Sequence, residues 1–173
     1  MNRVTTCQQT NGSSDAVQFD DSATGSSSIT IALNTNPTPA SVTVNASKNH
    51  VISGSGSIGG AGSLAKSGSG TLTLSTANTF SGVVSLNSGT VIFSALNNLG
   101  SGSSINFGGG TLQYNGNTDD ISARTVTLNA GGATINDGGN TITYGKPIGN
   151  NGAGGLCAWI PSPSCSGAAR TAR

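Results

Sequence analysis

One short phrase recurs in this chain, and it strongly limits what the chain can fold into. The phrase consists of two alternating apolar residues, a corner of small residues and two more apolar residues. Its copies span Val84–Phe93, Ile105–Tyr114 and Val126–Ile135, so that each position advances by 21 residues from copy to copy. A fixed period of this size is typical of stacked-repeat proteins, in which each repeat covers the apolar face of its neighbour.

The apolar residues of the phrase alternate with Thr, Ser or Asn, which is the pattern of β-strands. A period of 21 residues is long enough to return the chain to a parallel position in the next coil. We therefore predict an all-β chain of stacked parallel coils without substantial α-helix. Strands of successive coils would lie about 4.8 Å apart and pair through their backbones.

Stacking the copies predicts columns of interior side chains. The first strand of each coil gives the columns Val84, Ile105, Val126 and Leu86, Phe107, Leu128. The second strand gives the columns Leu72, Val91, Leu112, Ala133 and Leu74, Phe93, Tyr114, Ile135. The residue after the first strand is Asn45, Asn87, Gly108 or Asn129, and these types tolerate the positive φ that a tight corner needs.

The coil before these copies begins at Leu64 and contains Lys66. Placing Leu64 beneath Leu86 leaves Lys66 in solvent, whereas placing Leu64 beneath Val84 buries it. A buried lysine without a partner is rare, and we therefore predict the first register. Residues 53–63 are almost entirely Gly, Ser and Ala around Ile58, and they are expected to form either a poorly packed coil or a flexible loop.

The chain of 173 residues has room for one domain. The repeat pattern predicts a disordered N-terminal segment over 1–16, a parallel β-helix repeat domain over 17–156 and a disordered, non-repeat tail over 157–173. Only 8% of the residues are charged and the formal net charge is +1, so nothing attracts the chain to nucleic acid. No apolar run approaches the length that a membrane-spanning helix needs.

Residues 64–82, which read LAKSGSGTLTLSTANTFSG, resemble the autotransporter-associated β-strand repeat of bacterial surface proteins. Residues 88–91 and 95–102 resemble it too, and a looser likeness extends over 17–145. The resemblance implies a right-handed, single-stranded parallel β-helix of the pectin-lyase-like superfold. It also implies a passenger that is secreted or held at the bacterial surface and outer membrane. No signal peptide and no translocator is visible, and we therefore expect a fragment or a degenerate copy that reaches a membrane only through a translocator outside this chain.

Some parallel β-helix proteins act on polysaccharides, so paired carboxylates need to be considered. A glycosidase needs two carboxyl groups on either side of one bond. The candidates are Asp119, Asp120 and Asp137, and the last two are close enough in sequence to lie near one coil. Asp120 and Asp137 both lie at turns, near Gly or Asn, where Asp is favoured for its local hydrogen bonds. We therefore predict no catalytic residue and no enzyme, with a polysaccharide lyase or glycosidase as an alternative.

We also expect a structural role, and not a binding or catalytic one, for the other residues that could suggest a site. His50 is the only histidine, and we expect it to be a structural residue in a corner. The run Gly108–Gly110 is not followed by Lys-Ser/Thr, as a phosphate loop would be, and is predicted to be a corner. Asp137–Gly139 is a single instance of a pattern that calcium-binding repeats show many times. We predict no cofactor.

The three cysteines, Cys7, Cys157 and Cys165, fit no zinc-binding spacing. They are either incidental thiols or include one local disulfide between Cys157 and Cys165, which leaves one cysteine unpaired. We predict no metal site, and the sequence leaves the pairing of the cysteines open.

Threonine pairs suggest a second alternative, a flat array that binds ice or a crystalline polysaccharide. Thr-x-Thr occurs at Thr71/Thr73, Thr125/Thr127 and Thr141/Thr143. The first two pairs fall on different strands of the coil, and no continuous flat face is therefore expected. The function that we predict is a structural or adhesive spacer, with glycans or proteins of a host cell or matrix, or other cells, as partners.

Overall fold

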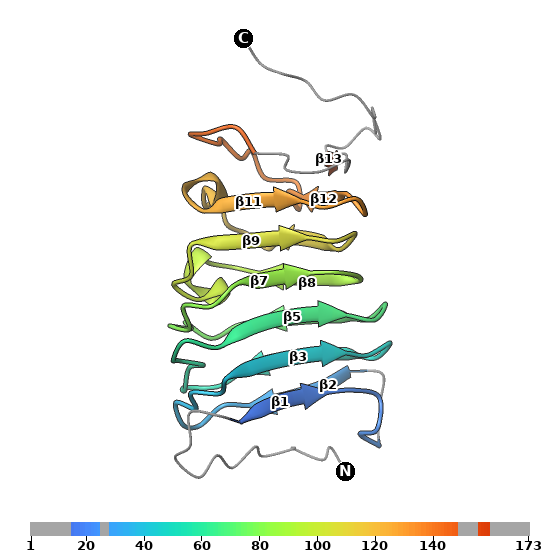
Figure 1. Cartoon of the computed structure of the whole chain (residues 1–173), viewed down its shortest axis with the longest axis vertical. Coiled ribbons are helices and arrows are strands. Elements are labelled where there is room, and N and C mark those ends of the chain that lie inside the picture. Colours follow the sequence, from blue (N-terminus) through green and yellow to red (C-terminus); the bar gives the residue numbers. More distant parts are fainter. Residues whose placement is uncertain (1–14, 25–27, 149–155, 160–173) are drawn as a thin grey trace.

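A computed structural model describes residues 15–24 and 28–148 and the backbone of 156–159, and it shows a stack of β-coils (Figure 1). Two sheets form two sides of the stack. Sheet A contains β1 (Ala16–Phe19), β3 (Ser41–Asn45), β5 (Ser63–Ser67), β7 (Val84–Leu86), β9 (Ser104–Phe107) and β11 (Thr125–Leu128). Sheet B contains β2 (Ser28–Ala32), β4 (Asn49–Ser53), β6 (Thr71–Leu74), β8 (Thr90–Phe93), β10 (Thr111–Tyr114), β12 (Ala133–Asn136) and β13 (Leu156–Trp159).

Every strand of sheet A pairs in parallel with the next odd-numbered strand, and sheet B is likewise parallel throughout. The corners at Gly89 and Gly110 join strands of different sheets, so neither corner is a hairpin. The prediction of an all-β parallel β-solenoid is therefore confirmed. The two helices of the described chain, η1 (Leu96–Leu99) and η2 (Ile121–Ala123), are short 3-10 turns.

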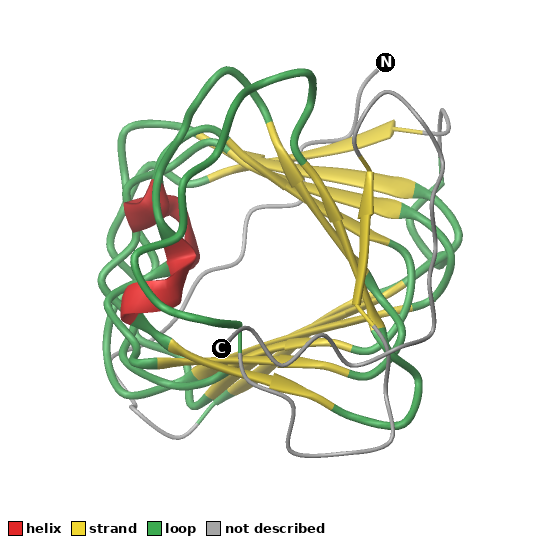
Figure 2. Ribbon diagram, turned by 90° about the horizontal axis from the view of Figure 1, so that it is seen from above, coloured by secondary structure: helices red, strands yellow, loops and turns green. Residues whose placement is uncertain are grey.

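The third side of the coil, which we call the loop side, contains both 3-10 turns and faces the two sheets across the core (Figure 2). It consists of the segments 33–40, 54–62, 75–83, 94–103 and 115–124. Residues 54–62 pack well, because Ile58 is 5% exposed and its carbonyl accepts hydrogen bonds from the amides of Thr79 and Phe80. The expectation of a poorly packed coil or a flexible loop there is wrong.

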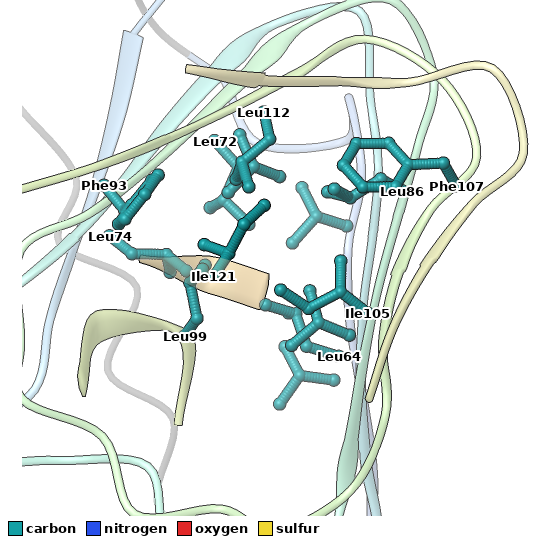
Figure 3. Close-up of a cluster of buried hydrophobic side chains, with 14 of the residues drawn as sticks. Leu64, Leu72, Leu74, Leu86, Phe93, Leu99, Ile105, Phe107, Leu112 and Ile121 are labelled. Carbon is teal, nitrogen blue, oxygen red and sulfur yellow. The ribbon is translucent and has the colours of Figure 1, made fainter. Parts of the chain in front are cut away.

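The interior columns run along the stack as the 21-residue period predicts. Val84, Ile105 and Val126 are register partners on sheet A, and the same holds for the column of Leu86, Phe107 and Leu128. On sheet B, Leu72, Val91 and Leu112 form one column, and Leu74, Phe93 and Tyr114 form the next. Figure 3 shows Leu86 beside Phe107, its register partner, and Leu72 and Leu112 of the other column, with Leu99 and Ile121 of the loop side pointing into the same core. Each buried Leu or Ile contributes about 1.5–3 kcal/mol.

The register predicted for Lys66 is wrong. Leu64 pairs with Val84, and Lys66 lies in an interior column between Val44 and Leu86. The residue is 1% exposed, and its Nζ donates to the carbonyls of Ser67 at 2.6 Å and Gly68 at 2.9 Å. The apolar stem can lie in the core because the ammonium reaches the corner carbonyls, and these charge-assisted bonds offset part of the desolvation.

The columns predicted for the last coil of sheet B are also wrong. Leu112 pairs with Ile135, not with Ala133, and Tyr114 therefore does not stack beneath Ile135. The corner before β12 is two residues longer than the corner before β10, while sheet A keeps its 21-residue step. The longer corner moves every residue of β12 by two positions, which preserves its inward and outward faces because strand side chains alternate.

Glycine is required at the corner between β7 and β8. Gly89 has φ +67°, and a Cβ there would lie 2.5 Å from the carbonyl oxygens of Gly68 and Gly70 and 2.7 Å from Lys66 Nζ. At the next corner the positive φ belongs to Gly109, at +126°, and the expectation that Gly108 adopts it is wrong. At Gly89 the backbones of successive coils thus approach too closely for any side chain.

The expected domain limits fall near the ends of the described chain. Strand β1 begins at Ala16, and β13 extends the backbone pairing of sheet B past the expected limit at residue 156 to Trp159. Residues 1–14 and 160–173 lie outside the described residues. Within the described part, no helix is both long and apolar enough to cross a membrane.

Candidate functional surfaces

Asp120 is one of the three predicted catalytic candidates, and it holds the loop side together. Its Oδ1 accepts the amide of Ser122 at 2.7 Å and so caps the start of η2. Its Oδ2 accepts the amide of Gly145 from the next coil at 2.8 Å. These hydrogen bonds from Ser122 and Gly145 lower the pKa of the carboxyl. An ionised carboxylate that is already occupied by two amides suits a structural role better than proton transfer.

The other two aspartates also accept backbone amides. Asp119 Oδ2 accepts the amide of Leu96 from the preceding coil at 2.6 Å, and Asp137 Oδ1 accepts the amide of Gly139 at 2.9 Å within its own turn. Asp119 and Asp120 lie side by side on one loop, whereas Asp137 begins the loop of the following coil. Each carboxylate is therefore assigned to a turn or to a contact between coils.

His50 lies in β4 and not in a corner as expected. It occupies an interior column between Ile29 and Leu72 and is 1% exposed. Its Nδ1 lies 3.1 Å from the carbonyl oxygen of Lys48, and its ring is tilted at 46° against that of Phe19. The histidine is thus part of the core.

The remaining candidates do not come together as a site. Gly108–Gly110 form the corner between β9 and β10, and no helix starts there. Among the described residues, no three His, Cys, Asp or Glu side chains converge as metal ligands would. Cys7 and Cys165 and the side chain of Cys157 lie outside the described residues, so their pairing stays a prediction.

Two buried asparagines on the loop side connect successive coils, and sequence reasoning missed both. Asn78 Oδ1 accepts the amide of Ile58 in the coil below at 2.9 Å, and its Nδ2 donates to the carbonyl of Asn98 in the coil above at 2.7 Å. Asn98 Nδ2 donates back to the carbonyl of Thr76 at 2.9 Å. Asn98 Oδ1 also accepts the amide of Ala95 at the start of η1. The sequence offered one signal for this pair, because Asn78 and Asn98 are 20 residues apart, close to the length of one coil.

Arg124 is a second clamp on the loop side. Its guanidinium donates to the carbonyls of Leu96, Leu99 and Gly100 at 2.6–3.1 Å, around the end of η1 in the preceding coil. A 3-10 turn leaves its last carbonyls without partners, and a planar guanidinium can satisfy several of them at once. The positive charge therefore completes a turn and is not displayed for a ligand.

A similar clip joins the two N-terminal corners. Asp21 accepts the amides of Ser47 and Lys48 and the hydroxyl of Ser47, at 2.8–3.1 Å. The hydrogen bonds from Ser47 and Lys48 lower the pKa of Asp21 to about 2. Lys48 Nζ in turn donates to the carbonyls of Asp21 and Ala23.

The outer face of sheet B differs from these surfaces, because it displays a regular row of hydroxyl groups. Thr71, Thr90, Thr111 and Thr134 are register partners on four successive strands, and we call them the threonine column. The neighbouring outward column contains Val51, Thr73, Ile92, Gln113 and Asn136. All nine side chains are half-buried, as expected of a flat strand surface.

The expectation that no continuous face forms is therefore wrong in one respect. The pairs Thr71/Thr73 and Thr125/Thr127 do lie on different sheets, and Thr141/Thr143 lie on no strand. The column arises from single threonines instead. In three coils the threonine directly follows a corner glycine, at Gly70, Gly89 and Gly110, and this Gly-Thr dipeptide is a signal that the sequence offered.

Comparison with known proteins finds a family model that matches one segment of this chain. Residues 64–93, which extend from β5 to β8, match the family model of the passenger-associated-transport-repeat. This match confirms the resemblance to the autotransporter-associated repeat. No curated protein and no solved structure matches the chain significantly.

Proposed function

We propose that this chain is a non-catalytic, structural and adhesive segment of a bacterial passenger that is secreted or displayed at the cell surface. The observation that carries the proposal is the passenger-associated repeat at residues 64–93, which lies within a regular solenoid. A solenoid gains about 4.8 Å of length per coil and needs only contacts between neighbouring coils, so it is an economical way to extend from a surface.

The side chains support a passive role over a polysaccharide lyase or glycosidase. The carboxylates that would serve as acid and base, Asp119, Asp120 and Asp137, each accept a backbone amide. A described recess beside Pro39, Ile58 and Phe80 is apolar and leaves no space for a water molecule. Adhesion would instead use the broad polar faces of the sheets, with glycans or proteins of a host cell or matrix, or other cells, as partners.

Two assays test this proposal. Purified chain should release no product from pectin, alginate or glucan, and beads coated with it should adhere to cells or matrix more than beads coated with the chemically unfolded chain. Turnover that is lost on Asp120→Asn or Asp137→Asn would establish an enzyme and overturn the non-catalytic role. Equal adhesion of folded and unfolded chain would overturn the adhesive role.

A further inference from the structure

The hydroxyl groups of the threonine column have no partner in the described protein. Thr71, Thr90, Thr111 and Thr134 use their backbone amides in the stack, but no side-chain hydrogen bond involves their hydroxyls. The loop side shows the opposite situation, since Asn78, Asn98 and Asp119 are all engaged between coils. Water occupies exposed hydroxyls by default, so the threonine column can exchange water for a ligand without disturbing the coils.

The described side chains of the same face carry no charge. The outward residues of β2, β4, β6, β8, β10 and β12 are Ser, Thr, Asn, Gln, Ala, Val and Ile, without a single Asp, Glu, Lys or Arg. Nucleic acids and acidic polysaccharides are bound chiefly through Lys and Arg, which this face does not offer. A neutral partner meets no desolvated charge here and fits the face electrostatically.

The neighbouring column adds apolar surface beside the hydroxyls. Val51 and Ile92 lie in it, half-buried, on either side of Thr73. A sugar ring presents both hydroxyl groups and C–H faces, so this combination of hydroxyl and methyl groups suits it. The hydroxyls of the threonine column recur once per strand spacing, about 4.8 Å, which lets a chain with hydroxyls at regular intervals bind along the stack.

We propose that the outer face of sheet B binds a neutral polysaccharide, extended along the threonine column. The inference rests on the proposed adhesive function and gives it a surface and a class of partner. Each interaction is weak by itself, and affinity comes from repetition along the stack.

The test is native electrophoresis through gels that contain a neutral glucan, with alginate gels as the anionic comparison. The wild-type chain should be retarded by glucan and not by alginate. Thr90→Val with Thr111→Val removes two hydroxyls while keeping the β-branched shape, and should weaken glucan binding about tenfold, the equivalent of two modest hydrogen bonds. The matched control, Thr43→Val with Thr127→Val on the outer face of sheet A, should bind glucan like the wild type.

Several outcomes would overturn the inference. These are equal loss of binding in both double variants, retardation by alginate alone, or an effect of the sheet B variant on ice growth without glucan binding. Circular dichroism checks folding, and if the double variant unfolds, Thr90→Val alone should still weaken binding. If coated beads adhere to cells equally with and without the threonine substitutions, this inference fails and the adhesive function stands. If the wild-type chain binds neither glucan nor cells, both fail.

Discussion

The outer face of sheet B and the loop side are both polar, but in the described chain the loop side, and not the threonine column, supplies side-chain hydrogen bonds between coils. On sheet B the backbone ladders already join the coils, and the side chains of the threonine column are not needed to hold the coils together. On the loop side backbone bonds between coils are scattered, and Asn78, Asn98 and Arg124 complete the stacking with side-chain bonds. The side chains of the threonine column are therefore left available to a partner because the backbone ladders already hold the coils together on sheet B.

We expect the largest loss of stability from a substitution on the inner face of sheet B. This loss is the reference for the smaller effects expected on the loop side and at the corners. Leu112→Asp places an unpaired charge between Val91 and Ile135 and should cost about 4–5 kcal/mol of the free energy of unfolding. Urea denaturation followed by circular dichroism measures it. Asp137→Asn, which keeps an acceptor for the Gly139 amide, should change the urea midpoint little. The reverse ranking would contradict the core described here.

The loop side should show the next largest effect. Asn98→Ala leaves the buried carbonyl of Thr76 and the amides of Ser94 and Ala95 without partners, and we expect a loss of about 2–4 kcal/mol. Urea midpoints and hydrogen exchange at Ala95 report the change. Asn97, the exposed neighbour of Asn98, provides the matched control. Asn97→Ala should change the free energy of unfolding by no more than about 0.5 kcal/mol. Equal effects of the two substitutions would show that the amide bonds do not hold the coils.

Lys66 offers a pH-dependent test of the boundary between core and corner. Burial lowers the pKa of Lys66 from 10.5, and the unfolded chain therefore binds the proton more tightly than the folded chain. Stability should accordingly rise with pH between the lowered folded value and 10.5. Lys66→Met should reduce this rise in the urea midpoint. Lys146→Met removes the same charge from an exposed position and reports how much of the slope comes from net charge alone.

The smallest effect is expected at the exposed corner clip of Asp21. Hydrogen bonds from Ser47 and Lys48 lower its pKa from 3.8 to about 2, so its stabilisation is present above pH 4 and is lost as the pH falls toward 2. Asp21→Asn should flatten the fall of the urea midpoint over this range. Ser47→Ala, which keeps both amide donors, should flatten it only in part. If the urea midpoint of both variants fell with acid as in the wild type, groups other than Asp21 would cause the loss of stability.

Much of this fold follows from the sequence because the interior columns obey a simple period. Val84, Ile105 and Val126 could be assigned to one column because apolar residues recur every 21 positions on a strand pattern. Lys66 could not be placed in the core, since the rule against burying lysine ignores the long stem that reaches the carbonyls of Ser67 and Gly68. A rule about residue type was applied where side-chain length decided the outcome.

The surfaces were harder to predict, because they depend on small changes in corner length and on irregular loops. Two extra residues before β12 bring Thr134, instead of Gly132, into line with Thr111, and this completes the threonine column. The hydrogen bonds of Asn78 and Asn98 depend on which backbone groups of the loop side lack a backbone partner. A periodic sequence pattern does not predict which groups these are. The neutrality of sheet B could have been predicted directly from its alternation of residues.

The stacking of parallel coils also determines how this chain yields to a pulling force. Tension on one end loads the hydrogen bonds of the terminal coil before those of any other, because each coil is bonded only to its neighbours. A detached coil of 21 residues can extend to about 70 Å, whereas it occupied about 4.8 Å in the stack. A solenoid built in this way lengthens stepwise under load, and the coils that remain stacked keep their shape.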